Sequence, residues 1–135
     1  MIDTERITRI KQLMNSFRVA AKKEQIAIFS GYASFPLNSC TWASFAFGGL
    51  LKELEPDQDW HLVNGLNPRT SFRHDWLSDG HLAVDITADQ FQNESPFVGP
   101  GPPPIAKMYL PQARHELSEA HLPHLEALVA IRKLM

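Results

Sequence analysis

The feature that most constrains the fold is a segment of alternating side chains, residues 72–87, with Asp79-Gly80 near its middle. Asp-Gly is a signal for a two-residue turn, because glycine readily adopts the positive φ that a tight hairpin turn requires. On both sides of the turn, apolar and polar residues alternate as they do in strands with one buried face. The segment therefore predicts a β-hairpin. Its apolar face is formed by Leu77, Leu82, Val84 and Ile86.

A two-residue loop also fixes which residues of the hairpin face each other. Counting outward from the loop places Leu77 opposite Leu82, and His74 opposite Asp85. Directly opposed residues have Cβ atoms about 4.5–5.5 Å apart. An imidazole and a carboxylate are thus expected to be neighbours, in the geometry in which an acid orients a histidine and raises its basicity. Trp76 shares this polar face, where it either shields the pair from water or belongs to the core.

The second informative feature is a helix predicted from Cys40 to about Leu54. Asn38 and Ser39 precede it, and both are favourable N-cap residues, while Pro56 marks its end. Cys40 then lies in the first turn, where unsatisfied backbone N–H groups and the helix dipole favour a thiolate. The same N–H groups can donate to an oxyanion. Cys40 is therefore a candidate nucleophile.

The other elements before residue 92 complete an α+β fold. Residues 3 to about 23 carry apolar side chains at helical spacing, with Asp3 or Thr4 as the N-cap, and predict an amphipathic packing helix. Residues 60–65 predict a strand that pairs with the hairpin. The expected architecture is a small antiparallel sheet of three strands packed on the helix that begins at Cys40.

The C-terminal third is punctuated by proline. Residues 92–104 predict a semi-rigid connector, partly of polyproline type. Residues 105–110 predict one more short strand, and residues 112 to the end predict helix. Pro123 either divides this helix or stands in the first turn of its second half.

The composition is that of a soluble globular protein, and the length of 135 residues fits a single domain, residues 1–135. A net charge of −2 without a basic run argues against nucleic acid and anionic membranes as partners. No apolar stretch is long enough to span a bilayer, and the polar N-terminus lacks a signal-peptide pattern. A cytoplasmic protein is expected, or one exported without a cleaved signal. The single cysteine excludes an intramolecular disulfide and a cysteine-rich zinc site.

Cys40, His74 and Asp85 occur in an order that resembles the transglutaminase-like branch of the papain-like cysteine hydrolases, in particular small bacterial proteins of that branch. The resemblance covers residues 30–91. It is carried by Phe35-Pro36-Leu37-Asn38-Ser39-Cys40, His74-Asp75-Trp76-Leu77 and Val84-Asp85-Ile86-Thr87-Ala88-Asp89-Gln90-Phe91. Two departures stand out. Asp75 follows the histidine where a small residue is expected, and Asn38-Ser39 precede the cysteine where glycine is common.

The resemblance implies a papain-like fold and a cysteine-dependent amide hydrolase or acyl transferase that needs no cofactor or metal. Cys40 would attack the amide of a glutamine side chain or a peptide bond in a protein or peptide substrate. His74 would take the thiol proton and return it to the leaving amine, and Asp85 would hold the imidazole tautomer. Water resolves the thioester in a protease or deamidase, and an amine does so in a transglutaminase. The Cys40 backbone N–H, with the Asn38 side chain, is the expected oxyanion site, and Gln90 either contacts the histidine or braces its loop.

Three alternatives remain open. The first is a bacterial effector or toxin deamidase on the same scaffold, with an immunity or regulatory partner. The second is a catalytically silent binding module. The third is a structural metal-binding protein, because His115, His121 and His124 cluster near the C-terminus, although no His-Glu-x-x-His pattern occurs.

Overall fold

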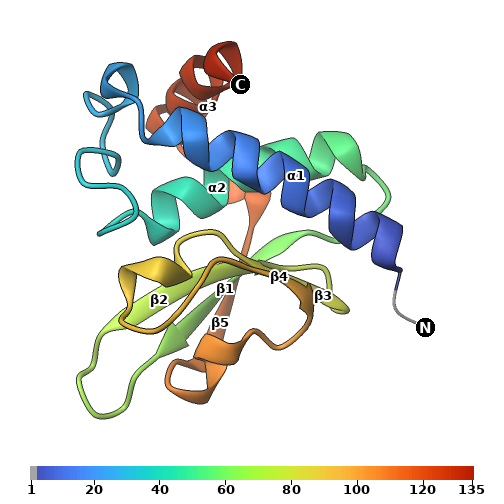
Figure 1. The fold of residues 1–135 in the computed structure, drawn as a ribbon. Coiled ribbons are helices and arrows are strands. Elements are labelled where there is room, and N and C mark those ends of the chain that lie inside the picture. Colours follow the sequence, from blue (N-terminus) through green and yellow to red (C-terminus); the bar gives the residue numbers. More distant parts are fainter. Residues whose placement is uncertain (1–2) are drawn as a thin grey trace.

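The computed structural model describes residues 3–135 and has three α-helices on one side of a five-stranded antiparallel sheet (Figure 1). The helices are α1 Thr4–Ala21, α2 Cys40–Leu54 and α3 Leu122–Leu134. The strands are β1 His61–Leu66, β2 Arg73–Ser78, β3 Leu82–Asp85, β4 Phe97–Pro100 and β5 Leu110–Glu116, in the spatial order β4-β3-β2-β1-β5. The predicted α+β class is confirmed, with five strands where a three-stranded sheet and one further short strand were expected. Across residues 3–135, no helix combines the length and the apolar character needed to cross a membrane.

The main core lies between the helices and the sheet. Its fully buried side chains include Ile10, Phe17, Phe47, Leu51, Leu77 and Val84. The rings of Phe17 in α1 and Phe47 in α2 meet edge to face with centroids 5.4 Å apart. The predicted apolar face of the hairpin is confirmed, because all four of its residues belong to this core.

A second, smaller apolar cluster lies on the opposite face of the sheet. It comprises Trp76, Ala83, Ile105, Ala106 and Tyr109. A 3-10 helix, Pro104–Lys107, runs beneath the sheet and supplies two of these residues (Figure 1). Both faces of β2 are therefore covered, and its polar residues His74 and Asp75 are both buried although they point to opposite faces.

The pairing of β2 with β3 differs from the prediction. Leu77 pairs with Val84 and Ser78 with Ala83, so the predicted two-residue loop was wrong and the partners lie two residues further along β3. Because side chains alternate with a period of two, this shift leaves each of them on its predicted face.

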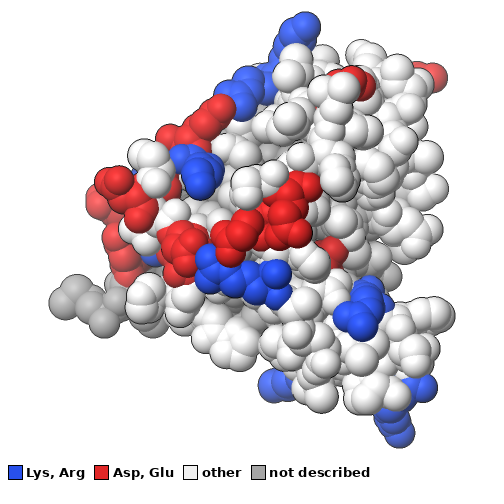
Figure 2. Space-filling view, turned by 180° about the vertical axis from the view of Figure 1, so that it is seen from behind, with Lys and Arg blue, Asp and Glu red and all other residues white. Residues whose placement is uncertain are grey.

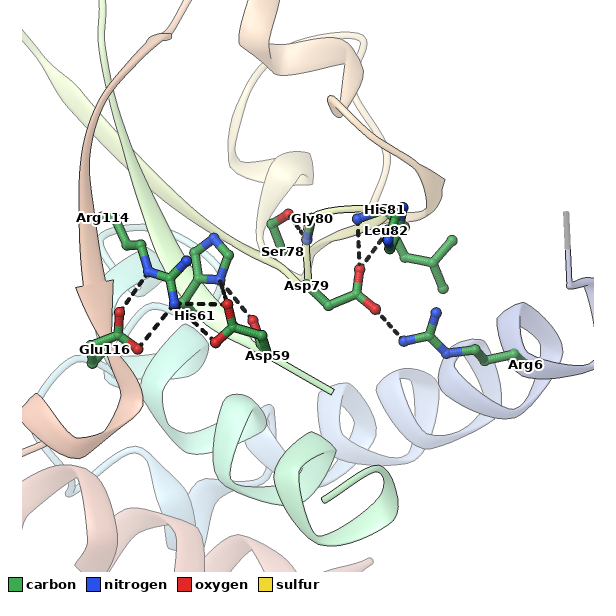
Figure 3. Close-up of polar contacts among 10 residues, drawn as sticks. All are labelled: Arg6, Asp59, His61, Ser78, Asp79, Gly80, His81, Leu82, Arg114 and Glu116. Carbon is green, nitrogen blue, oxygen red and sulfur yellow. Dashed lines mark hydrogen bonds and ion pairs between the residues drawn. The ribbon is translucent and has the colours of Figure 1, made fainter. Parts of the chain in front are cut away.

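The wider loop is held by Asp79. Its carboxylate accepts hydrogen bonds from the N–H groups of His81 at 2.9 Å and Leu82 at 2.7 Å and pairs with Arg6 of α1 (Figure 3). Arg6 also donates to Glu55 at the end of α2, at 2.6 and 2.7 Å. Burial raises the pKa of Asp79, but Arg6 and the two N–H groups outweigh burial and hold that pKa below its ordinary value. One arginine thus joins α1, α2 and the hairpin.

The C-terminal third departs most from the prediction. The expected connector, residues 92–104, contains strand β4, and the expected strand at residues 105–110 is largely the 3-10 helix Pro104–Lys107. Residues 112–116 belong to β5 rather than to a helix, and a 3-10 helix, Leu117–Glu119, follows. Pro123 stands in the first turn of α3, which confirms one of the two roles considered for it.

Charged side chains are paired at several places on the surface. Figure 2 shows acidic side chains gathered on the back of the molecule with Lys and Arg among them. On β5, Arg114 donates to Asp59 at 2.9 Å and to Glu116 at 2.6 Å (Figure 3). Such exposed pairs each contribute little to stability.

Candidate active site

Cys40 is the first residue of α2 and is partly exposed. Ala43 N–H donates to Ser39 C=O at 2.8 Å, which is the first bond of the helix. The N–H groups of the first three helical residues therefore have no acceptor within the helix. The predicted helix start is confirmed, and it leaves these donors beside the thiol.

The two residues before Cys40 do not cap the helix with their side chains. The buried Ser39 hydroxyl lies against the carbonyl oxygens of Gly31 and, at 3.1 Å, Leu37, so it anchors the preceding loop. Asn38 is exposed and adopts a left-handed φ of 58°, a conformation that asparagine tolerates better than most residues. The structure places Asn38 close to Cys40 in the chain, with its side chain in solvent.

His74 and Asp85 meet in the interior. His74 Nε2 lies 2.8 Å from Asp85 Oδ2, and both side chains are fully buried. The second Asp85 oxygen accepts the Thr87 N–H at 3.3 Å. The predicted contact is therefore present, although the register places Trp76, not His74, level with Asp85. The carboxylate fixes which nitrogen of the ring points away from it, namely Nδ1.

The other walls around His74 are aromatic. The rings of Phe91, Tyr109 and Trp76 lie 4.9, 5.8 and 6.2 Å from the imidazole centroid. Trp76 is 2% exposed and belongs to the second apolar cluster. The core role considered for it is therefore confirmed, and its ring also lies near the imidazole.

Burial lowers the pKa of His74, but the hydrogen bond with Asp85, the neighbouring Cys40 and the negative charge that either partner can carry raise the pKa to about 9. This interaction brings Cys40 into the same site as His74 and Asp85. The other contact of the sulfur is with Thr41 Oγ1 at 3.9 Å. The thiol and the imidazole are thus neighbours without the tight alignment of a short hydrogen bond, as is common in sites without substrate.

Gln90 lies on the free side of the ring, with Nε2 3.1 Å from His74 Nδ1 and 3.4 Å from Thr87 Oγ1. A donating amide nitrogen requires a neutral Nδ1, because a protonated Nδ1 cannot accept. With a charged ring, the amide oxygen must occupy that place. Gln90 therefore both contacts the histidine and braces its loop, and its two amide orientations match the two charge states of His74.

Three linked polar residues near the start of α2 were not singled out as site residues from the sequence. Thr41 Oγ1 donates to Asp75 Oδ2 at 2.5 Å, and Asn64 Nδ2 donates to Asp75 Oδ1 at 2.6 Å. Asp75 is 5% exposed. The available signal was the acid after the histidine, where the resemblance leads one to expect a small residue.

The three C-terminal histidines lie near this group rather than around a common centre. His115, His121 and His124 line the same cavity as Thr41 and Asp75. Within residues 3–135, no group of three or more His, Cys, Asp or Glu side chains is arranged to hold a metal ion.

Comparisons of the chain with protein-family models, with curated proteins and with solved structures found no match in any of the three. The side chains of the site are therefore the basis for assigning a function.

Proposed function

We propose that this chain is a cysteine-dependent amide hydrolase or acyl transferase, of protease, deamidase or transglutaminase type, on a papain-like and transglutaminase-like scaffold. The observation that carries the proposal is the buried 2.8 Å contact between His74 and Asp85, on a histidine that also interacts with the single cysteine of the chain. A histidine held by an acid and adjoining a thiol at a helix N-terminus is the arrangement that activates a sulfur nucleophile.

Cys40 reacts as the thiolate, because its proton has passed to the His74 imidazole, while Asp85 accepts a hydrogen bond from Nε2–H. The thiolate attacks the carbonyl carbon of a glutamine side chain or a peptide bond, and the carbonyl oxygen takes the negative charge. The N–H groups at the start of α2 and the Asn38 side chain are the proposed donors to this oxygen. On collapse, the C–N bond breaks, ammonia or an amine leaves with the proton from His74, and a thioester remains on Cys40.

The second half of the reaction uses the same groups in reverse. Water or an amine gives a proton to His74 and attacks the thioester carbonyl. The C–S bond breaks, the sulfur regains the proton, and an acid or a new amide is released. The proposed partner is a protein or peptide that carries the reacting glutamine or amide.

The experiment is acyl-enzyme trapping with glutamine-containing peptides, read by intact mass with and without hydroxylamine. The proposal predicts a covalent adduct on the parent protein and a peptide hydroxamate when hydroxylamine is present. Neither product should form with Cys40→Ala. Undiminished product formation by Cys40→Ala would contradict the proposal.

One observation favours a second candidate, a binding module without catalysis. The side chain of His74 is fully buried, whereas a general acid must reach the leaving group. The two candidates differ in the reactivity of Cys40, since only the catalytic one requires a thiolate at neutral pH.

A further inference from the structure

A cavity of about 800 Å³ opens beside Cys40, between the N-terminal ends of α2 and α3 and the strands β1 and β2. Thr41 lies in its wall, and the hydroxyl of Thr41 is 3.9 Å from the Cys40 sulfur. The volume is within the range of about 300–1,000 Å³ that is typical of ligand pockets. A group bound here would lie next to a substrate amide that approaches the sulfur.

The innermost charged group of this cavity is the carboxylate of Asp75. Its two oxygens accept one hydrogen bond each, from Thr41 and Asn64. A carboxylate has about four acceptor sites, so roughly half of its capacity remains unused. The donors are neutral, and a buried carboxylate without a cation is energetically unfavourable.

No basic side chain within residues 3–135 forms an ion pair with Asp75. Arg73 lies on the same strand, but it donates to Asn64 Oδ1 at 2.6 Å and thereby supports the donor rather than the acid. The negative charge of Asp75 is therefore compensated only by hydrogen bonds from neutral groups.

The aromatic and acidic residues that also line the cavity are compatible with a bound cation. The ring centroid of His124 lies 4.6 Å from that of Trp42 and 4.8 Å from that of Phe45. Burial and the neighbouring His121 lower the pKa of His124, so this ring adds no positive charge at neutral pH. Aromatic faces attract guanidinium and ammonium groups, and Glu119 adds a second carboxylate to the lining.

We propose that this cavity binds a cationic side chain of the substrate, arginine or lysine, with Asp75 as its counter-ion and Thr41 and Asn64 as positioning residues. The inference rests on the proposed function, because it makes the cavity the neighbouring subsite of Cys40. The substrate class is then a protein or peptide with a basic residue close to the reacting amide.

The test compares two probes on the Cys40→Ala protein by isothermal titration or by NMR shifts. The first probe is Nα-acetyl-arginine amide. The second is the citrulline analogue, in which a neutral urea group replaces the guanidinium at nearly the same shape. We expect the arginine probe to bind at least about tenfold more tightly, because hydrogen bonds to a charged partner are the stronger class. Equal binding of the two probes would overturn the proposal.

Asp75→Asn supplies the matched variant, since it removes the charge and keeps the shape. The preference for arginine should fall to below about twofold in this variant. Asp57→Asn is the control, because Asp57 is exposed and lies outside the cavity lining. A preference that survives Asp75→Asn, or that is lost in Asp57→Asn, would overturn the assignment. The probe comparison itself needs no substitution in the cavity, so it decides the question even where Asp75→Asn does not fold.

These measurements use a protein without the sulfur, so they are independent of the proposed chemistry. If the arginine probe is strongly preferred but Cys40 proves unreactive, the cation site is supported and the proposed catalytic function is contradicted. If Cys40 is reactive but the two probes bind equally, the proposed catalytic function is supported and the cation site is contradicted.

Discussion

His74 Nε2 and Asp85 Oδ2 lie 2.8 Å apart although the two residues are not opposite each other in the sheet. They are diagonal neighbours on one face of β2 and β3, and such neighbours are about 7–8 Å apart, with somewhat closer Cβ atoms, within reach of long side chains. The contact can therefore form when the pairing of β2 with β3 is shifted by two residues. A shift of one residue would prevent it, because the acid would then lie on the helix-facing side of the sheet.

The raised pKa of His74 predicts a pH-dependent stability. A group whose pKa is about 6.5 unfolded and about 9 folded adds stability below pH 6.5, and this contribution is lost as the pH rises through 9. The loss should be of the order of 3 kcal/mol. Urea unfolding at about pH 6 and about pH 9.5 measures it, with His74→Gln as the control. The same pH dependence in parent and control would show that His74 is not responsible.

Removal of Arg6 should destabilise the fold. Arg6→Ala leaves the carboxylates of Glu55 and Asp79 without their cation, and we expect a loss of about 2–3 kcal/mol in the free energy of unfolding. Arg9→Ala, on an exposed position of the same helix, should change stability by less than about 0.5 kcal/mol. Equal effects of the two substitutions in urea unfolding would contradict the role given to Arg6.

Two glycines should respond oppositely to alanine. A Cβ at Gly65 would lie 2.6 Å from the Tyr109 carbonyl oxygen and 2.8 Å from the ring of Trp76. We therefore expect Gly65→Ala to destabilise the protein by about 1–3 kcal/mol. At Gly49 in α2, the new methyl would meet only the end of the Leu128 side chain, at 2.9 Å. The gain in helix propensity, about 1 kcal/mol, should make Gly49→Ala neutral or stabilising. Thermal unfolding of both variants measures this contrast. A Gly65→Ala protein that is as stable as the parent would contradict the prediction.

Local patterns predicted the part of the fold that carries the site. The spacing of apolar residues and the loop before Cys40 gave the correct start of α2, and the alternation around Asp79 gave the correct faces of the hairpin. The register could not be derived locally. It depends on the Asp79 carboxylate, which accepts two loop N–H groups and is held by Arg6, a residue distant in sequence.

The strands missed at the C-terminal end have a different explanation. β5 is an edge strand whose side chains are nearly all exposed, so it carries no apolar alternation. What defines it is backbone pairing with β1, which side-chain patterns do not record. β4 is the other edge strand, and it is short and contains Gly99 and Pro100, residues that usually indicate a turn.

The most direct test of the proposed triad is the rate at which iodoacetamide alkylates Cys40 at about pH 6.5, read by intact mass. The references are the same chain unfolded in urea, His74→Ala and Asp85→Asn, each variant first checked for folding by circular dichroism. We predict that the folded parent reacts at least about tenfold faster than its unfolded chain and that both variants lose this advantage. A folded parent that reacts no faster than the unfolded chain, or an advantage that survives His74→Ala, would contradict the assignment of Cys40, His74 and Asp85 as one catalytic unit.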